Sequence, residues 1–239
     1  MPNYFDLNVH AYPETETGSS VEELLRVARR YGYAGIAVTN HDELLKEELR
    51  LNSIALYTGV EIRANSVVEL KRKIKFYHGK TALLAVHGGN AKINRAAVED
   101  SRVDILAHPC GGAREDGDGD GDGVLNHVLV RYAAENSVAI DFNMNGIIYN
   151  RRGERARIIG KMRDNLRLLR KYKAPMILTS NARSVYDLRA PREMIALASL
   201  FGMTKVEATS ALSDIPLDIL ERRGEKERAV EVLLPTFRT

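Results

Sequence analysis

The sequence lacks several features that define particular classes of protein. Among its 239 residues Cys110 is the single cysteine, so no disulfide can form within the chain and no cysteine cluster can hold zinc. Its longest apolar runs, such as residues 82–86, are far shorter than the ~20 residues of a membrane-spanning helix. The first residues have neither the basic start nor the apolar stretch of a signal peptide. We therefore expect a cytoplasmic protein that does not enter a membrane.

Nucleotide-binding motifs and aromatic RNA-binding strands are also missing. No GxGxxG follows the first predicted strand and no loop is a Walker-type phosphate cradle, which disfavours a nucleotide-binding sheet without excluding one. Tyr and Phe are scattered rather than gathered in a strand of the RRM type, so any bound RNA would be held by phosphate and shape contacts. No Pro-rich or Ser-rich linker divides the chain, which predicts one domain over residues 1–239.

Short apolar segments alternate with helical patterns along nearly the whole chain. Strands are predicted at residues 4–10, 35–41, 54–61, 82–87, 103–108, 138–143 and 176–180. Between them apolar residues recur at helical spacing, for example over residues 21–28 and 67–77. A Ser at position 19 or 20, followed by Glu22 and Glu23, is a helix start signal. This alternation predicts an α/β fold, either a single barrel or a doubly wound sheet.

An acidic, glycine-rich segment interrupts the pattern at residues 115–123. Its alternating Asp and Gly resemble the start of a calcium loop. The position where an EF-hand needs its Glu is His127 when counted from Asp116, and Leu129 when counted from Asp118. We therefore expect a flexible, solvated loop with at most weak, nonspecific affinity for cations.

Five of the predicted strands end in a residue that can bind a metal ion. These residues are His10, His41, Glu61, His87 and His108. A single His at a strand end is usually structural, but in a parallel barrel all strand C-termini open on one face, so five such residues would converge. Alternation along the first strand would place Asp6 and Asn8 on the same face as His10, with Leu7 and Val9 on the other. His and Glu are suitable ligands for zinc, manganese or iron.

The strand-end segments resemble those of the polymerase-and-histidinol-phosphatase (PHP) superfamily. The resembling segments are residues 6–10, 38–41, 59–61, 86–88 and 107–109. Members of that superfamily are metal-dependent phosphoesterases, with His-x-His after the first strand and Thr-Asp-His after the second. A Glu, two His and a final Asp-x-His complete their site.

Four positions depart from that pattern. Asn8 stands where the first His belongs and Asn40 where the Asp belongs, while Asn181 and Arg183 replace the final Asp and His. Asn carries no charge to neutralise a metal cluster, and Arg adds a permanent cation. We therefore expect no catalytic metal, and interpret the five strand-end residues as vestigial ligand positions. One ion held by His10, Glu61 and a neighbouring His stays open, and a stand-alone PHP-type phosphoesterase is the alternative function.

A closer resemblance covers nearly the whole chain. Residues 94–99 (NRAAVE) and 187–193 (DLRAPRE) are the most distinctive stretches in which it resembles the archaeal ribonuclease P protein component 3 family, whose eukaryotic relatives are the thirty-kilodalton subunits. The resemblance implies a distorted TIM-like barrel of about seven parallel strands ringed by helices. It also implies a subunit of the ribonucleoprotein that removes the 5′ leader from precursor tRNA.

In such a particle the RNA is the catalyst and uses magnesium. The resemblance thus implies an isolated chain that is non-catalytic and has no intrinsic cofactor. Its implied partners are ribonuclease P RNA, precursor tRNA, protein component 2 and the other ribonuclease P proteins. Components 2 and 3 are expected to form a dimer of heterodimers.

Positive charge is concentrated in one segment, although the net charge of the whole chain is only +3. Residues 151–173 hold ten Lys and Arg against two acids, and Ile158, Met162, Leu166 and Leu169 mark the buried stripe of a helix. The predicted RNA-binding residues here are Arg151, Arg152, Arg155, Lys161, Arg163, Arg167, Arg170 and Lys171. The alternatives are a solvated helix face, which usually mixes signs, and a protein scaffold whose basic helix meets an acidic partner.

Further arginines follow the predicted strands and are expected around the same opening as the histidines. They are Arg63, Arg95, Arg183, Arg189 and Arg192, and Arg pairs well with phosphate. Salt bridges to Glu193 and Asp187 are the alternative. For a second basic group, at residues 71–75, RNA contact and simple solvation are equally open.

Overall fold

The computed structural model describes residues 2–14, 18–45, 54–109, 125–222 and 230–232 of the chain. At its centre, seven parallel strands pair in chain order. They are β1 (Tyr4–Val9), β2 (Tyr33–Val38), β3 (Ile54–Ile62), β4 (Leu83–His87), β5 (Ile105–Ala107), β6 (Ala139–Asn143) and β7 (Met176–Thr179). All seven predicted strands are present. The acidic segment 115–123 and Cys110 lie outside the described residues.

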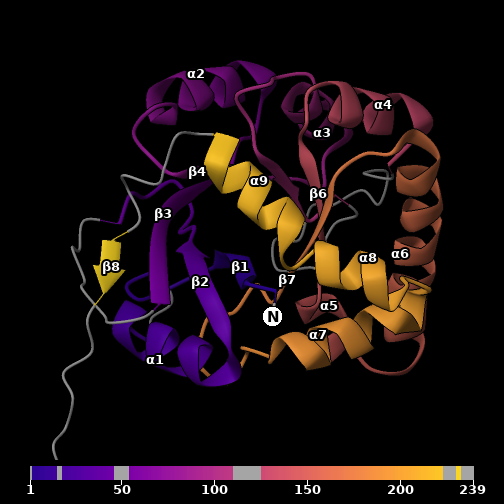
Figure 1. Ribbon diagram of the computed structural model, residues 1–239. Helices are drawn as coiled ribbons and strands as arrows, with labels where there is room; N and C mark the ends of the chain where they lie inside the picture. Colours follow the sequence, from indigo (N-terminus) through magenta and orange to yellow (C-terminus); the bar gives the residue numbers. More distant parts are fainter. Residues whose placement is uncertain (1, 15–17, 46–53, 110–124, 223–229, 233–239) are drawn as a thin grey trace, which may run out of the picture.

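Helices surround the sheet (Figure 1). They are α1 (Val21–Tyr31), α2 (Val67–Tyr77), α3 (Ala91–Val98), α4 (His127–Glu135), α5 (Asn145–Tyr149), α6 (Arg152–Tyr172), α7 (Pro191–Ala198), the 3-10 helix η1 (Ser199–Phe201), α8 (Lys205–Ser210) and α9 (Asp214–Arg222). Ser20 caps α1 in a capping box with Glu23, as the start signal predicts. No helix among the described residues combines the length and hydropathy needed to cross a bilayer.

The strands curl into a nearly closed barrel. Within the described residues, its seam is joined by one isolated parallel bridge between Val9, at the end of β1, and Ala182, just after β7, where the His10 N–H donates to the Ala182 carbonyl at 2.8 Å. The TIM-like barrel is therefore confirmed, with an incomplete seam between β1 and β7. A short strand that the sequence analysis missed, β8 (Val230–Val232), pairs antiparallel with the start of β3.

The predicted alternation of faces along β1 is wrong at its end. The pairing register with β2 shifts between Asp6 and Val9. As a result Leu7 packs in the cluster that includes Ala85 and Ala107, whereas Val9 packs in the cluster that includes Leu24 of α1. An irregular register of this kind re-aims side chains relative to a strict two-residue repeat.

The two ends of the barrel are built differently. Helix α9 crosses one end (Figure 1), where its Ile219 and Leu220 pack with residues near the starts of strands, such as Phe5, Leu83 and Ile177. The opposite end, which we call the barrel mouth, carries the loops that follow the strands. In barrels of this type the functional groups come from those loops.

Candidate functional site

The structure brings all five strand-end residues together at the barrel mouth. Glu61, which is fully buried, lies at their centre. One of its carboxylate oxygens, Oε1, is 2.5 Å from Nδ1 of His87, 3.3 Å from Nε2 of His41 and 3.7 Å from Nε2 of His108. The other oxygen, Oε2, is 3.6 Å from Nε2 of His10. The rings of His10 and His41 are stacked, with centroids 4.6 Å apart.

Glu14 is a sixth member of this group, which we call the histidine cluster, and the sequence analysis missed it. It lies in the loop after β1, and its carboxylate contacts Nδ1 of both His10, at 3.1 Å, and His41. Glu14 belongs to neither a strand nor a helix, so the spacing of residues in the sequence does not indicate that it joins the cluster. By engaging both Nδ1 atoms, Glu14 turns the Nε2 atoms of the two rings toward Glu61.

Two of the three asparagines that replace expected ligands have structural partners, whereas the buried Oδ1 of Asn181 has no hydrogen-bond partner among the described residues. Asn8 donates from Nδ2 to Glu61 Oε2 at 2.9 Å and accepts from Thr39 Oγ1 at 2.7 Å. Asn40 makes two hydrogen bonds to the backbone of Ala11, at 2.8 and 3.1 Å. Asn8 therefore takes up one oxygen of Glu61, and Asn40 fastens the loop that carries Glu14.

Two carboxylates of the cluster stabilise a positive charge on His41. Burial alone would lower the pKa of His41, but hydrogen bonds to Glu14 and Glu61 raise it to about 9. Burial likewise opposes ionisation of Glu14, while contacts with His10 and His41 hold the pKa of its carboxyl far below the ordinary value. His41 is therefore a cation between two carboxylates at neutral pH.

Metal binding is the chemistry that the PHP-like strand ends would imply, and the residues fit it in part. Ligand atoms of His10, His41 and Glu61 lie within 4.8 Å of one another, as do those of Glu61, His87 and His108. The buried Nε2 of His10 has no hydrogen-bond partner among the described residues. Both sets share Glu61, so a divalent cation in either set would be held by this carboxylate and two histidines. A multinuclear centre would need more anionic ligands than these.

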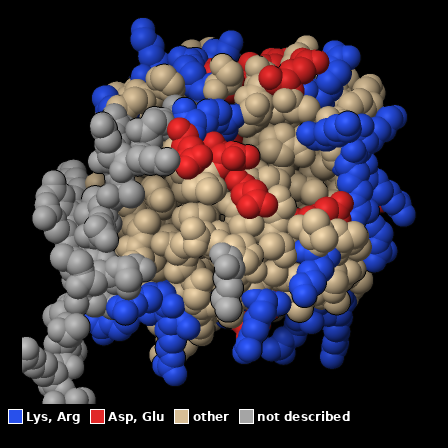
Figure 2. Space-filling view, in the orientation of Figure 1, with Lys and Arg blue, Asp and Glu red and all other residues tan. Residues whose placement is uncertain are grey.

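The cations of α6 differ in what they contact. Arg157, Arg167 and Lys171 lie on the outer face, where, among the residues that the structure describes, Arg157 and Arg167 form ion pairs only with acids three residues earlier on the same helix. Figure 2 shows Lys and Arg side chains along the edge of the molecule where Figure 1 places α6. Arg157 was not among the residues that the sequence analysis singled out. Arg151 and Arg152 are also exposed, at the start of α6, and Lys161 is half-buried.

Three other arginines of α6 fasten the helix to its neighbours. Arg155 donates to the carbonyls of Asn150 and Ile148 at the end of α5, at 2.7 and 3.4 Å. Arg163 donates to the carbonyl of Leu200 at 3.3 Å. Arg170 makes two hydrogen bonds to Glu207, both 2.7 Å, and a third to the Gly202 carbonyl. These side chains have a structural role that the charge pattern does not reveal.

The arginines after the strands do not share one environment. Arg63 is exposed beside His87, whereas Arg95 is exposed on α3 and pairs with Glu99 at 2.8 Å. Arg183 is half-buried in the loop after β7, and Arg192 is exposed near the start of α7.

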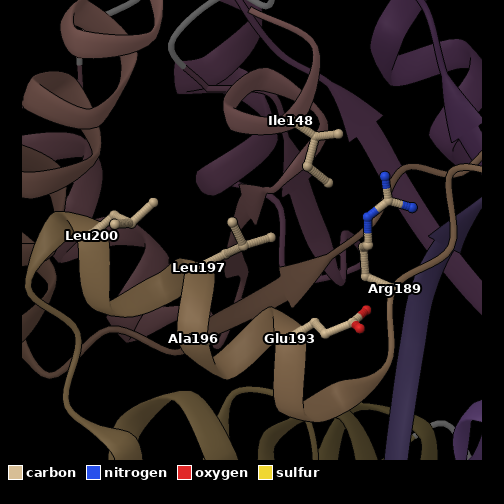
Figure 3. A pocket seen from close by; sticks show the side chains of 6 residues that line it. All are labelled: Ile148, Arg189, Glu193, Ala196, Leu197 and Leu200. Atoms are coloured by element: carbon tan, nitrogen blue, oxygen red, sulfur yellow. The ribbon is translucent and has the colours of Figure 1, made fainter.

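Arg189 lines a separate hollow between α5 and α7. Figure 3 shows Ile148, Leu197 and Leu200 on its apolar walls, with Arg189 and Glu193 at one end. The hollow measures about 450 Å³. The Arg189 guanidinium donates to the carbonyls of Tyr186 and Leu188, at 2.7 and 2.8 Å. Asp187 instead accepts from Ser184 and from Tyr149.

Comparison with known proteins matches nearly the whole chain. The model of the family described as RNase P subunit p30 matches residues 3–228. Ribonuclease P protein component 3 of Methanococcoides burtonii is 44% identical over 231 residues, covering 95% of this chain and 91% of that protein. Its counterpart in Methanosarcina mazei is 38% identical over 240 residues, covering 97% and 96%.

Solved structures share the fold at lower identity. A chain in the cryo-EM structure of archaeal ribonuclease P with mature tRNA superposes with a TM-score of 0.74 and 24% identity, over 98% of both chains. A histidinol phosphate phosphatase from Lactococcus lactis has a TM-score of 0.53 and 10% identity, over 83% of this chain and 92% of that one. Both likenesses show the same barrel architecture.

Proposed function

This chain belongs to the RNase P subunit p30 family and is thereby a protein subunit of ribonuclease P, and we propose that within this particle it contacts and supports the catalytic RNA without doing chemistry itself. Ribonuclease P removes the 5′ leader from precursor tRNA. The RNA would supply catalysis and bind the magnesium it uses, so the protein needs no cofactor of its own.

The outer face of α6 is the observation that carries the RNA contact. Arg157 and Arg167 are 55% and 70% exposed, and their acidic partners Glu154 and Asp164 lie on the same helix. Exposed ion pairs of this kind contribute little stability, so fold stability does not account for these cations. Segregated positive charge on one surface is what phosphate neutralisation requires.

The make-up of the histidine cluster supports a non-catalytic role. Asn8 and Asn40, which stand at two ligand positions of the PHP pattern, are hydrogen-bonded into the fold, and Asn181 stands at a third. The carboxylates of Glu61 and Glu14 are in direct contact with histidine side chains. A stand-alone phosphoesterase is therefore not favoured.

Protein partners are proposed alongside the RNA. The relatives are component 3 proteins, and we take component 2 as the direct partner, in a dimer of heterodimers, with precursor tRNA and the other ribonuclease P proteins in the same cytoplasmic particle. The hollow between α5 and α7 supports a protein contact, because Leu200 on its wall is 47% exposed and Tyr149, the neighbour in the chain of the lining residue Ile148, is 56% exposed. Exposed apolar patches of this kind mark protein-binding surfaces.

Reconstitution tests the proposal directly. The chain is added to ribonuclease P RNA, with and without component 2, and cleavage of precursor tRNA is measured at several magnesium concentrations. We expect the protein pair to lower the magnesium requirement and the chain alone to cleave nothing. Cleavage of precursor tRNA by the chain without RNA, abolished by His10→Ala, would refute the non-catalytic role.

A further inference from the structure

A small pocket opens at the barrel mouth between the loops that follow β3 and β4. Arg63, Asn65, His87 and Asn90 are among the residues that line it, and its volume is about 150 Å³. That volume is roughly what five water molecules occupy in the liquid. It accommodates a phosphate group and is too small for a whole nucleotide.

The polar groups around this pocket can donate hydrogen bonds. The side chain of Asn90 accepts from the backbone N–H groups of Lys92 and Ile93 through Oδ1, at 2.9 and 3.3 Å, which leaves its Nδ2 group to donate elsewhere. Arg63 is exposed, and within the described parts of the chain its guanidinium has no ion-pair partner. A guanidinium of this kind can hold two oxygens of one phosphate.

The acid next to the pocket is already paired: Glu69 accepts from the backbone N–H of Asn65 at 3.0 Å and forms an ion pair with Lys73 at 3.0 Å. No acid is among the described residues that line the pocket. The carboxylate of Glu61 lies beneath it, fully buried, and His87 Nδ1 contacts that carboxylate at 2.5 Å. The opposite edge of the His87 ring therefore faces away from Glu61, and its side chain is 32% exposed. The His87 ring lies between the pocket and the buried carboxylate, and the donors that an anion would meet are the side chains of Arg63, Asn65 and Asn90.

Exposed cations lie on the two helices that follow the pocket loops in the chain. Helix α2 begins just after Asn65 and carries exposed Lys71, Arg72 and Lys75, and α3 begins after Asn90 and carries exposed Lys92. A lone small anion would use only the pocket. A chain of phosphates would also reach these cations, which is why a polyanion fits this surface better than an acidic side chain of a protein.

We propose that this pocket binds one backbone phosphate of an RNA strand, with Arg63 as the cation and Asn65 and Asn90 as donors. The inference rests on the proposed RNA contact of the chain and adds a second surface to it, at the barrel mouth.

The first experiment uses inorganic phosphate as the probe. Side-chain amide signals of Asn65 and Asn90 are followed by NMR in the full chain while phosphate replaces chloride at constant ionic strength. We expect saturable shifts in the wild type and in Arg29→Ala, a control that removes an exposed arginine of α1. Arg63→Ala should show none, and Arg63→Lys, which keeps the charge, should show weaker binding. Equal titration curves for Arg63→Ala and the wild type would overturn the proposal.

The second experiment measures binding of ribonuclease P RNA as a function of salt. Loss of one phosphate contact should weaken binding about five- to eightfold near 0.1 M salt and flatten the slope of log K against log salt by about 0.7–0.9. Arg63→Ala should show both effects. Asn65→Ala, which removes no charge, should weaken binding and leave the slope unchanged.

The results that would disprove phosphate binding in the pocket differ from those that would disprove the proposed function. If the wild type binds RNA and Arg63→Ala binds it equally well, only the pocket assignment is wrong. If Arg63→Ala instead loses component 2 in the absence of RNA, the pocket takes a carboxylate of that protein and the proposal is overturned. If the wild type binds no ribonuclease P RNA with or without component 2, the RNA contact itself is wrong.

Discussion

The RNA contact of the outer face of α6 can be tested with two variants that each remove three positive charges from this helix. The two variants are expected to differ in RNA binding and in stability. The first variant replaces the outer residues Arg157, Arg167 and Lys171 with Ala. The second replaces the anchoring residues Arg155, Arg163 and Arg170 with Ala. Both lose the same charge from the same helix, so net charge alone predicts the same change in RNA binding for each.

The expected magnitudes follow from the contacts. Three lost phosphate contacts should flatten the slope of log K against log salt by about two to three units, which near 0.1 M salt weakens RNA binding about 10²- to 10³-fold. The outer variant should otherwise fold normally, because exposed substitutions usually cost under ~0.5 kcal/mol each. The anchoring variant should lose about 1–2 kcal/mol at Arg170 alone, where a charged, partly exposed pair and a carbonyl contact disappear.

Binding to ribonuclease P RNA across a salt series and thermal melting are measured for both variants. An outer variant with the wild-type slope would refute RNA contact by this face, and loss of component 2 in its place would assign the face to the protein partner. Equal flattening in both variants would show that total charge, rather than position on α6, determines binding. An anchoring variant as stable as the wild type would refute the structural role of its three arginines.

Three further outcomes are expected. Glu61→Gln should lower the free energy of unfolding by about 3–5 kcal/mol, because the His41 cation loses a buried carboxylate partner; a melting temperature within about 2 °C of the wild type would contradict this. With a metal chelator present, the stability that His41 contributes should be complete below pH 6.5 and should disappear as the pH rises to about 9, since the pKa of His41 is higher in the folded than in the unfolded chain. Urea titrations should show this loss of stability in the wild type and not in His41→Gln. The same loss in both proteins would refute the assignment to His41. Ser20→Ala should cost about 1 kcal/mol of stability by removing the cap of α1, whereas Ser20→Asp should restore it, and equal melting of the two variants would count against the cap.

The barrel strands and the residues at their ends could be predicted from the sequence, because both depend on the local order of apolar and polar residues. An apolar run bounded by polar residues specifies a buried strand, and parallel strands bring their last residues to one face. That reasoning places His10, His41, Glu61, His87 and His108 together without knowledge of any contact. It also locates the basic helix, because its buried stripe and charged face follow helical spacing.

Partners distant in sequence required the tertiary structure. Glu14 joins the histidine cluster only because the loop after β1 folds back over His41, and no periodicity records that path. β8 is three residues long and is a strand only because the start of β3 is free to pair with it.

Helix α6 shows most clearly which properties the sequence determines and which need the tertiary structure. Arg155 and Arg157 stand two residues apart in one helix and are equivalent in any count of charge. Arg155 meets carbonyl oxygens at the end of α5, whereas Arg157 meets solvent and the Glu154 carboxylate. Charge and helical spacing are properties of the local chain, but whether a cation is bound into the fold or left for an external phosphate depends on which neighbour packs against it.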